Sequence, residues 1–344
     1  MRNIGVDLHK NSFLVCFLAC PAGRLNKEEK EKRKYKIEEI DKFRKELRKS
    51  DKVGVESTTN TRYFVEQIKE RVKEVVIVNP TQFRIISQSV KKTDEEDAER
   101  IAVYLSKGML PEVRMKEKSH SQINSIANTR DKLVKLRTIL KNKIHNILSA
   151  HGILSKKEDF TSEKGLSRVL DYQVDEAAKV ELEVIVEQIR HLNEGIKKLE
   201  NEMTDRGENL KGYENITSIK GIGKKGGTIL LSVIGDVNDF ENEKKLAAYF
   251  GIVPRVNNSN EKVQMGRITK HGSALGRTTL VQCTLIAKKY SPFLNEFYER
   301  IKRKKGSGKA IIATARKFLG IIYNTLKNNW IFEDFPNFII KNPV

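Results

Sequence analysis

The segment RNIGVDLHKNSFLVCFLA, residues 2–19, decides the fold of the first part of the chain. Both halves are rich in apolar residues and the polar stretch His9 to Asn11 separates them, which predicts two short strands joined by a turn. Further along, KVGVES at 52–57 and EVVIVNP at 74–80 have the composition of buried strands, and helices are expected at about 36–49 and 61–72. Strands followed by alternating helix and strand predict a mixed α/β sheet within residues 1–115.

Acidic side chains stand at the ends of these predicted strands. Asp7 interrupts an apolar strand, where an unpaired charge would be costly, and Glu56 ends the strand KVGVE. The stretch KKTDEEDAERIAVYL at 91–105 contains further acids. Thr93 as N-cap, with Glu96 completing a capping box, predicts a helix start there. That start places Asp94 and Asp97 on one face of the first helical turn.

Strand ends and a helix start can meet at one edge of a mixed sheet. Four carboxylates would then come together: Asp7, Glu56, Asp94 and Asp97. Oxygen ligands of this kind bind Mg²⁺ or Mn²⁺. A pair of such ions stabilises the attacking and leaving oxygens of a phosphodiester displacement. The alternative for any one acid is a cap or a solvated charge, which is our interpretation of Glu95, Glu96 and Glu99.

The charge of the whole chain indicates the kind of partner. It has 344 residues, with 65 Lys and Arg against 45 Asp and Glu, and a formal net charge of +20. This balance favours nucleic acid over other partners. No apolar run reaches the roughly 18 to 20 residues of a spanning helix, so no membrane partner is expected. Without a signal-peptide pattern we expect a protein of the prokaryotic cytosol, associated with the nucleoid. Cys16, Cys20 and Cys283 fit neither a disulfide framework nor a zinc site and are expected to be core thiols.

The middle of the chain has a helical pattern. Residues 117–150 and 173–207 are rich in Lys and Glu, with apolar residues at helical spacing, and predict two antiparallel helices around a polar connection near 154–168. They would form an arm or coiled coil that serves as a spacer or in dimerisation. We therefore expect three domains, at 1–115, 116–208 and 209–344, the last mostly helical.

A glycine-rich stretch opens the last region. ITSIKGIGKKGGTILLSVIGD, residues 216–236, contains a formal G-x-G-x-x-G, but a dinucleotide fingerprint would have to follow a strand and here helical sequence precedes it. A glycine turn between two helices, with backbone N–H groups and the side chains of Lys224 and Lys225 facing a phosphate, fits the charge of the chain better. A plain connecting turn is the alternative.

Two further segments combine cations with polar residues. FGIVPRVNNSNEKVQMGRITKHGSALGR, residues 250–277, contains Ser259 among basic residues that include Arg255, Arg267, Lys270 and Arg277. From chemistry alone Ser259 is one of several loop serines, and Ser273 is a rival to it. The strongest basic cluster is KRKKGSGK at 302–309, with Lys302, Arg303, Lys304, Lys305 and Lys309 as expected nucleic-acid contacts.

These motifs resemble a known family. IGVDLHK, VGVEST, VIVNP and KTDEEDAERIA look like the RuvC-type N-terminal domain of the DEDD transposases, the recombinases of bridge-RNA-guided insertion sequences. The pattern Pro-Arg, three residues, Ser, then Gly-x-Ile-x-Lys-x-Gly and a later Arg is similar to the family's second domain, in which the serine is the nucleophile. In this chain the pattern falls on Pro254, Arg255, Ser259, Gly266, Ile268, Lys270, Gly272 and Arg277.

The resemblance implies a ribonuclease H-like fold for residues 1–115, with Asp7, Glu56, Asp94 and Asp97 as the DEDD metal ligands and Ser259 as the nucleophile. It also implies donor and target DNA, a structured guide RNA, and a homo-oligomer, a dimer or tetramer, whose sites are shared between subunits. The function expected is therefore that of an RNA-guided DNA transposase or recombinase.

Two other functions remain open from the sequence. A metal-only DNA nuclease or Holliday-junction resolvase would use water as the nucleophile and leave Ser259 without a catalytic role. A non-catalytic nucleic-acid-binding protein with a degenerate nuclease fold is the third, and the intact set of four acids argues against it.

Overall fold

The computed structural model describes residues 1–19, 29–80, 82–83, 93–259 and 262–335, and within these ranges the side chains at 157, 257–259 and 262–265 lie outside the description. The chain divides into two compact units, Met1–Met115 and Lys116–Val344, which are described separately. The further division expected after residue 208 stays a prediction.

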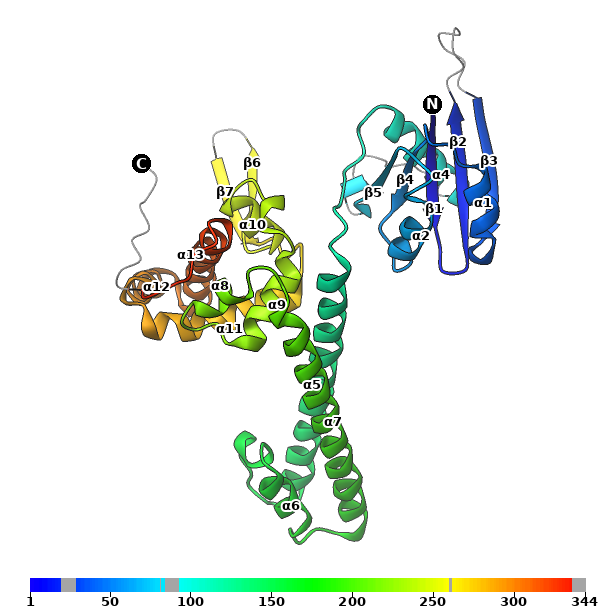
Figure 1. Cartoon of the computed structure of the whole chain (residues 1–344). Helices are drawn as coiled ribbons and strands as arrows, with labels where there is room; N and C mark the ends of the chain where they lie inside the picture. The colour runs from blue at the N-terminus through cyan, green and yellow to red at the C-terminus, as the bar shows by residue number, and fades with distance from the viewer. Residues whose placement is uncertain (20–28, 81, 84–92, 260–261, 336–344) are drawn as a thin grey trace. The chain divides into compact units, whose positions relative to one another are not determined.

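A five-stranded mixed sheet forms the centre of the first unit (Figure 1). Its strands are β1 Arg2–Leu8, β2 Ser12–Ala19, β3 Glu29–Lys36, β4 Lys52–Glu56 and β5 Glu74–Val78, in the spatial order β3-β2-β1-β4-β5. The first three strands pair antiparallel, whereas β4 and β5 run parallel to β1. The mixed α/β sheet was predicted from the sequence. Strand β3 was not, because its sequence EKEKRKYK buries only Tyr35 at the edge of the sheet.

Helices cover both faces of this sheet. They are η1 Ile37–Glu39, α1 Ile40–Glu46, α2 Thr61–Ile68 and α4 Asp94–Ser106. Helices α1 and α2 contribute Phe43 and Phe64 to the cluster that contains Phe13. On the opposite face, α4 places Ala98 and Ala102 against the alternate side chains of β2. Both α1 and α2 are shorter than the helices expected at 36–49 and 61–72.

Two glycines let α4 lie directly on the sheet. Gly5 of β1 and Gly54 of β4 are partners in register in neighbouring parallel strands. A Cβ atom at Gly5 would lie 2.0 Å from the carbonyl oxygen of Ala98, and one at Gly54 would lie 2.7 Å from a methyl group of Ile101. Because alternate residues of a strand share a face, Asp7 and Glu56 stand on the same face as the glycines, two residues further on.

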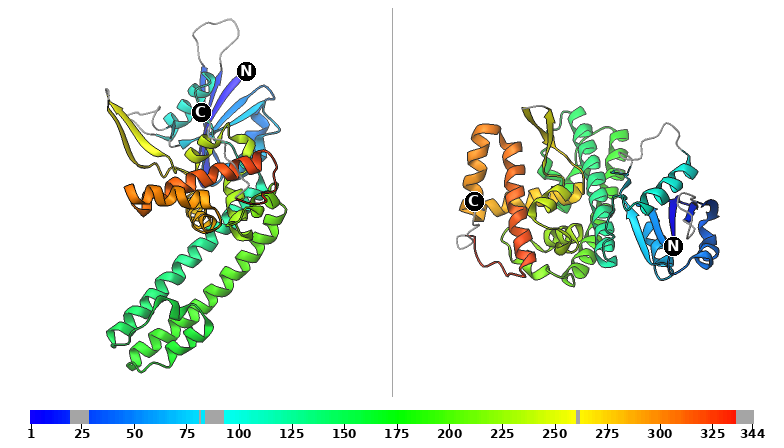
Figure 2. Two further views of the ribbon diagram at one scale, coloured as in Figure 1. Left: turned by 90° about the vertical axis from the view of Figure 1, so that its left-hand side faces the viewer. Right: turned by 90° about the horizontal axis from the view of Figure 1, so that it is seen from above.

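Two long helices begin the second unit. Helices α5 Lys118–Ala150 and α7 Glu176–Glu208 lie antiparallel and side by side (Figure 2), joined by ion pairs such as Arg130 to Glu200 and Lys143 to Glu181. At one end of the pair, the connection expected to be polar contains η2 Lys157–Phe160 and α6 Glu163–Leu170, which bury their apolar residues against α5 and α7. Coiled-coil packing of α5 and α7 stays a prediction.

The rest of the second unit is mostly helical, with one β-hairpin. Its elements are α8 Tyr213–Ser218, α9 Lys224–Ile234, η3 Val237–Asp239, α10 Glu243–Tyr249, β6 Pro254–Ser259, β7 Lys262–Ile268, α11 Ala274–Tyr290, α12 Pro292–Lys305 and α13 Ser307–Lys327. One apolar cluster holds these helices together, and α9 and α13 each contribute more buried residues to it than any other helix does. Among the helices that the structure describes, none has the length and apolar character needed to cross a bilayer.

The hairpin of β6 and β7 was not predicted from the sequence. Its strands are antiparallel, with Ser259 opposite Lys262 at the far end and an irregular register at Arg255. Glycines fix its base: at Gly272, where φ is +125°, a Cβ atom would lie 2.1 Å from the carbonyl oxygen of Tyr249. The backbone N–H of Lys270 donates to Gly251 across the same contact.

The cysteines that the structure describes are those expected to lie in the core. Cys16 and Cys283 are both buried free thiols, and burial raises the pKa of each to about 11. Because of this raised pKa, both cysteines are neutral thiols at pH 7, which agrees with a structural role. Cys20 lies outside the described residues.

Gly5→Ala tests the seating of α4 on β1. The added methyl group would meet helix backbone rather than a flexible side chain, so the helix has to lift or the strand has to bend. We expect a loss of about 3 kcal/mol in the free energy of unfolding of the first unit, measured by denaturant titration. Gly308→Ala is the matched control, because a Cβ atom there meets nothing within 4 Å. A Gly5→Ala protein as stable as the control would show that the close contact does not constrain α4.

Candidate active site

The acid edge, the group of Asp7, Glu56, Asp94 and Asp97, is built from three segments of the chain. Asp7 and Glu56 stand at the ends of β1 and β4, and Asp94 and Asp97 are in the first turn of α4. The helix starts where the sequence predicted, because the hydroxyl of Thr93 accepts a hydrogen bond from the backbone N–H of Glu96 at 3.3 Å. The first turn therefore presents its acids at the end of the sheet where β1 and β4 finish.

His9 joins this group, which the sequence analysis did not anticipate. Its Nε2 atom lies 3.2 Å from Oδ2 of Asp7 and 3.3 Å from Oδ2 of Asp94. The sequence places His9 in the polar turn after the first strand. The available signal was its spacing, because two residues beyond Asp7 a side chain can return to the same face of the sheet.

Asp7 is the most buried carboxylate of the group. Its side chain is 8% exposed. Burial raises its pKa from 3.8 to about 6; His9 opposes this rise, and Asp94, Glu56 and Asp97 add to it. Since all three of the other predicted acids act on its charge, the structure brings the four carboxylates into one electrostatic neighbourhood.

Asp97 and Asp94 differ in their surroundings. The guanidinium of Arg100, one turn further along α4, lies 3.6 Å from Asp97 and donates to Glu96 at 3.0 Å. Asp94 faces the imidazole of His9 instead, and its side chain is 55% exposed. Asp94 is therefore the acid most open to a ligand that arrives from solvent.

The donors of this group fit a divalent cation. Asp7, His9 and Asp94 each offer one ligand atom, and these atoms lie within 4.8 Å of one another. Carboxylate oxygens suit Mg²⁺ and Mn²⁺, and the imidazole nitrogen adds a donor that Mn²⁺ accepts more readily than Mg²⁺ does. Glu56 and Asp97 are near enough to contribute charge, since both raise the pKa of Asp7.

The two candidate serines lie in different settings. Ser259 ends β6, next to residues 260 and 261, which are not described, and its own side chain is outside the described part of the structure. Ser273 is the N-cap of α11, and its hydroxyl accepts a hydrogen bond from the N–H of Gly276 at 3.0 Å. Capping accounts for the presence of Ser273 without a catalytic role.

The basic residues around the hairpin divide into exposed and engaged side chains. Arg255, Arg267 and Lys270 are exposed. Lys270 has a φ of 57°, an unusual backbone conformation for a residue with a side chain, held by the contact with Gly251. Arg277, also predicted to contact nucleic acid, donates to the backbone carbonyls of Gly272 at 3.0 Å and Phe250 at 3.3 Å, which holds the base of the hairpin.

Lys224 and Lys225 are ion-paired in the structure. Lys224 contacts Glu208 at 2.9 Å and Lys225 contacts Glu200 at 2.8 Å, so both cations bind the end of α7. The turn before them has the expected form, since Gly223 is the N-cap of α9 and Gly221 has a φ of +106°. A phosphate at this turn would have to compete with these two glutamates for the lysines.

The cluster at 302–309 spans the junction of α12 and α13. Its members Lys302, Arg303, Lys304, Lys305 and Lys309 are all exposed. The first four lie in the last turn of α12, where cations are favoured by the helix dipole. Lys302 also contacts Glu299 and the ring of Tyr298. The remaining cations of the cluster face solvent and can approach a polyanion.

Comparison with known proteins agrees with this arrangement of two regions. The profile of the IS110 DEDD transposases matches residues 4–153, and the profile described as "Transposase IS116/IS110/IS902 family" matches residues 213–299. Together these segments cover more than half of the chain. The chain belongs to the IS110/IS116 family of DEDD transposases.

Individual relatives cover most of the chain at low identity. The transposase for insertion sequence element IS1111A of Coxiella burnetii is 26% identical over 72% of this chain and 71% of its own length. A probable family 20 transposase of Pseudomonas aeruginosa is 23% identical over 67% of this chain and 69% of its own. The pilin gene-inverting protein of Moraxella lacunata is 27% identical over 76% of this chain and 74% of its own.

The matched segments of this IS110/IS116-family chain contain most of the predicted site. Residues 4–153 include all four acids and His9, and residues 213–299 include both candidate serines and the cations of the hairpin. The basic cluster at 302–309 lies beyond the second match.

The raised pKa of Asp7 predicts how the metal-free protein responds to pH. A carboxyl group with a higher pKa in the folded than in the unfolded chain contributes stability that is present below the unfolded value, here 3.8, and is lost as pH rises through about 6. Asp7→Asn should therefore be more stable than wild type at pH 7, by on the order of 2 kcal/mol, and not at pH 4. Thermal unfolding in EDTA across this pH range measures the difference.

The same pair of proteins tests the binding of a divalent ion. Added Mn²⁺ should raise the melting temperature of wild type at pH 7 and leave that of Asp7→Asn unchanged. Asp41→Asn, which removes an exposed carboxylate of α1, is the control and should behave as wild type in both experiments. A wild-type melting temperature that does not respond to Mn²⁺ would contradict a metal site at this edge.

Proposed function

We propose that this chain is an RNA-guided DNA recombinase of the transposase type, which cuts and rejoins DNA strands with a serine nucleophile and an acid–metal site. The convergence of Asp7, Asp94 and His9, with Glu56 and Asp97 beside them, carries the proposal. The strand order β3-β2-β1-β4-β5, antiparallel and then parallel, supports the ribonuclease H-like fold that the resemblance implies.

One relative favours rejoining over simple cleavage. The Moraxella lacunata relative is named as a pilin gene-inverting protein. Inversion of a DNA segment requires that every strand that is cut be joined again, which hydrolysis by water does not provide. A covalent intermediate conserves the energy of the phosphodiester bond for the second step.

The proposed reaction uses the serine and the acids in separate roles. The Oγ atom of Ser259 forms a bond to phosphorus while the bond from phosphorus to the 3′ oxygen breaks. The serine hydroxyl gives its proton to a base, and the 3′ oxygen takes up a proton and leaves as a hydroxyl group. The product is a 5′-phosphoserine link, and the reverse step rejoins a strand. When bound, a divalent ion supplies Lewis-acid stabilisation of the charge on the phosphate.

The chain's own residues prepare the acid edge for this role. Asp7, Glu56, Asp94 and Asp97 would hold Mg²⁺ or Mn²⁺, with His9 as an added donor. Arg100 fixes the carboxylate of Asp97, and the burial of Asp7 keeps that oxygen away from bulk water. The acids belong to the first compact unit and Ser259 to the second, so the reaction requires an acid edge and a hairpin to meet, within one chain or between subunits of a homo-oligomer.

The proposed partners follow from charge and from the family. Donor and target DNA are the substrates of a transposase, and a structured guide RNA is implied by the resemblance to bridge-RNA-guided elements. A net charge of +20 supports polyanionic partners of either kind. The exposed cations Arg255, Arg267 and Lys270 on the hairpin would then contact the backbone near the nucleophile.

A covalent adduct separates a recombinase from a nuclease. With a nicked DNA substrate that traps the intermediate, wild type should remain attached to DNA after denaturation, and peptide sequencing should place the link on Ser259. Ser259→Ala and Asp94→Asn should bind DNA and form no adduct, because serine is a weak nucleophile without activation. Ser273→Ala is the matched control: it should form the adduct and lose about 1 kcal/mol of stability as a helix cap.

Two results would change the assignment. Cleavage at the wild-type rate by Ser259→Ala, with no covalent species in either protein, would make water the nucleophile and the protein a metal-only nuclease or resolvase. An adduct on Ser273 would keep the chemistry and move the nucleophile.

The exposed basic cluster predicts a measurable salt dependence. Each phosphate contact to duplex DNA contributes about 0.9 to the slope of log binding constant against log salt concentration. Changing Lys302, Arg303, Lys304, Lys305 and Lys309 to Gln should lower that slope by about 0.9 for every contact that is lost. Fluorescence anisotropy at several salt concentrations measures it, and circular dichroism checks that the fold is kept. An unchanged slope would place the DNA interface elsewhere.

A further inference from the structure

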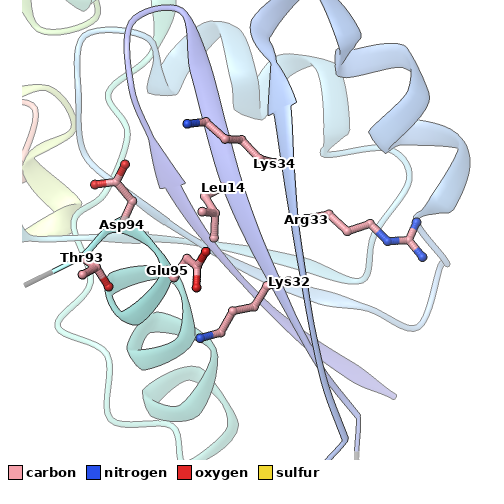
Figure 3. A pocket seen from close by; sticks show the side chains of 7 residues that line it. All are labelled: Leu14, Lys32, Arg33, Lys34, Thr93, Asp94 and Glu95. Atoms are coloured by element: carbon pink, nitrogen blue, oxygen red, sulfur yellow. The ribbon is translucent and has the colours of Figure 1, made fainter.

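An open cavity lies next to the acid edge, over strands β2 and β3. Its volume is about 750 Å³, and it is lined by Leu14, by Lys32, Arg33 and Lys34 of β3, and by the N-cap Thr93 and the first residues of α4, Asp94 and Glu95 (Figure 3). One wall therefore carries cations and the other carries Asp94 of the proposed active site. The floor is apolar, because Leu14 is nearly buried between them.

The register of the sheet aligns this cavity with the acid edge. Asp7 pairs with Leu14 across β1 and β2, and Leu14 pairs with Lys34 across β2 and β3. Residues directly opposite one another in antiparallel strands project from the same face. Asp7, Leu14 and Lys34 therefore form one row on the face that α4 covers, with two strand spacings, or about 10 Å, between the outer Cα atoms.

Lys34 is the cation of the cavity wall that is left for a ligand. Of the other three lysines on the same face of β3, Lys30 and Lys32 both bind Glu99 of α4, at 3.0 and 2.7 Å, and Lys36, at the end of the strand, does not line the cavity. The side chain of Arg33 points away from the cavity (Figure 3), to the opposite face of the sheet, and it pairs there with Glu46. Within the described parts of the chain Lys34 has no ion-pair partner, and its side chain is exposed beside the first turn of α4.

We propose that this cavity binds the backbone of the DNA strand that is being cut, with Lys34 contacting a phosphate close to the one at the acid edge. A single strand carries one phosphate for about every 3.4 Å of rise, so a cation 10 Å from Asp7 addresses a phosphate within about three nucleotides of the reacting bond. Thr93 adds a donor, since its hydroxyl oxygen accepts from Glu96 and its proton stays available for a phosphate oxygen.

This inference rests on the proposed function, which identifies the bound strand as the DNA strand that is cut. The acids that line the cavity explain why a cation is needed in it. Asp94 and Glu95 line the cavity and repel a phosphate. A lysine on the opposite wall offsets that repulsion and fixes the direction in which the strand enters. The role of Lys34 is positioning, because it contacts the substrate away from the atoms that react.

The competing explanation is that Lys34 only protects an edge strand. Strand β3 is at the edge of the sheet, and exposed lysines on edge strands prevent pairing with another chain. This explanation predicts that DNA binding is indifferent to Lys34, so a binding measurement distinguishes the two.

The test measures binding of full-length protein to a fluorescent single-stranded DNA oligonucleotide in Ca²⁺, over a range of salt concentrations. Lys34→Gln should weaken binding about tenfold and lower the salt slope by about 0.7, the contribution of one phosphate on a single strand. Lys34→Arg should restore both. The control, Lys45→Gln, removes an exposed lysine of α1 on the opposite face of the sheet and should bind as wild type.

A second measurement uses the adduct assay. Lys34→Gln should raise the DNA concentration for half-maximal adduct formation about tenfold and leave the rate at saturation within about twofold of wild type, which a general loss of structure would not do. Binding and salt slope identical to those of Lys45→Gln would overturn the inference. Weaker binding of an RNA oligonucleotide with unchanged DNA binding would also overturn it, since the occupant would then be RNA.

Failure of the recombinase proposal would be recognised separately. Binding in Ca²⁺ needs no turnover, so a weakened Lys34→Gln protein combined with the absence of any wild-type adduct would keep the strand-binding cavity and reject the serine mechanism. A normal adduct on Ser259, combined with unaltered DNA binding by Lys34→Gln, would keep the serine mechanism and reject the strand-binding cavity.

Discussion

The close contact between α4 and the glycine pair Gly5 and Gly54 is the constraint on which the acid edge depends. Carboxylates from two strands and one helix can act on a single ion only if the backbones that carry them approach closely. A side chain at Gly5 would occupy the space that the helix backbone fills, and one at Gly54 would meet the side chain of Ile101 of the same helix. The two glycines are neighbours in the sheet, and they precede Asp7 and Glu56 by two residues each. The same part of the sheet therefore contacts the helix and orients the acids.

The same contact concentrates negative charge, and the rest of the site offsets it. His9 lies between Asp7 and Asp94, Arg100 contacts Asp97, and the N-terminus of α4 has a dipole that favours anions. Burial is the main cause of the raised pKa of the Asp7 carboxyl, and the charges of Asp94, Glu56 and Asp97 raise it further against the opposing effect of His9. The divalent cation of the proposed function would complete the balance. Affinity for such an ion would then follow from assembling the edge, because the repulsion exists before the ion arrives.

Apolar patterning accounts for what could be predicted from the sequence. The runs around Val6, Val55 and Val76 fill a core and were predicted as strands. The aspartate among them, Asp7, is buried as part of the group that the sequence predicted, and its role as a site residue stays a prediction. Strand β3 buries only Tyr35, and the hairpin side chains that the structure describes, at 254–256 and 266–268, are exposed or half-buried, so neither segment has the apolar run of a buried strand. His9 was missed because its contacts depend on Asp94, 85 positions along the chain. The hydrogen bonds from Arg277 to backbone carbonyls were also missed, because they depend on a loop conformation that the sequence does not predict.

The row of Asp7, Leu14 and Lys34 also limits how such a chain can vary in length during evolution. Side chains alternate between the two faces of a strand, so one residue gained or lost inside β1, between Gly5 and Asp7, would turn the carboxylate into the opposite layer among Phe13 and Phe43. The same event within β3 would exchange Lys34 for a neighbour that faces away. Insertions and deletions should therefore accumulate between elements, and the two-residue interval from glycine to acid should stay fixed in length where loops of relatives differ.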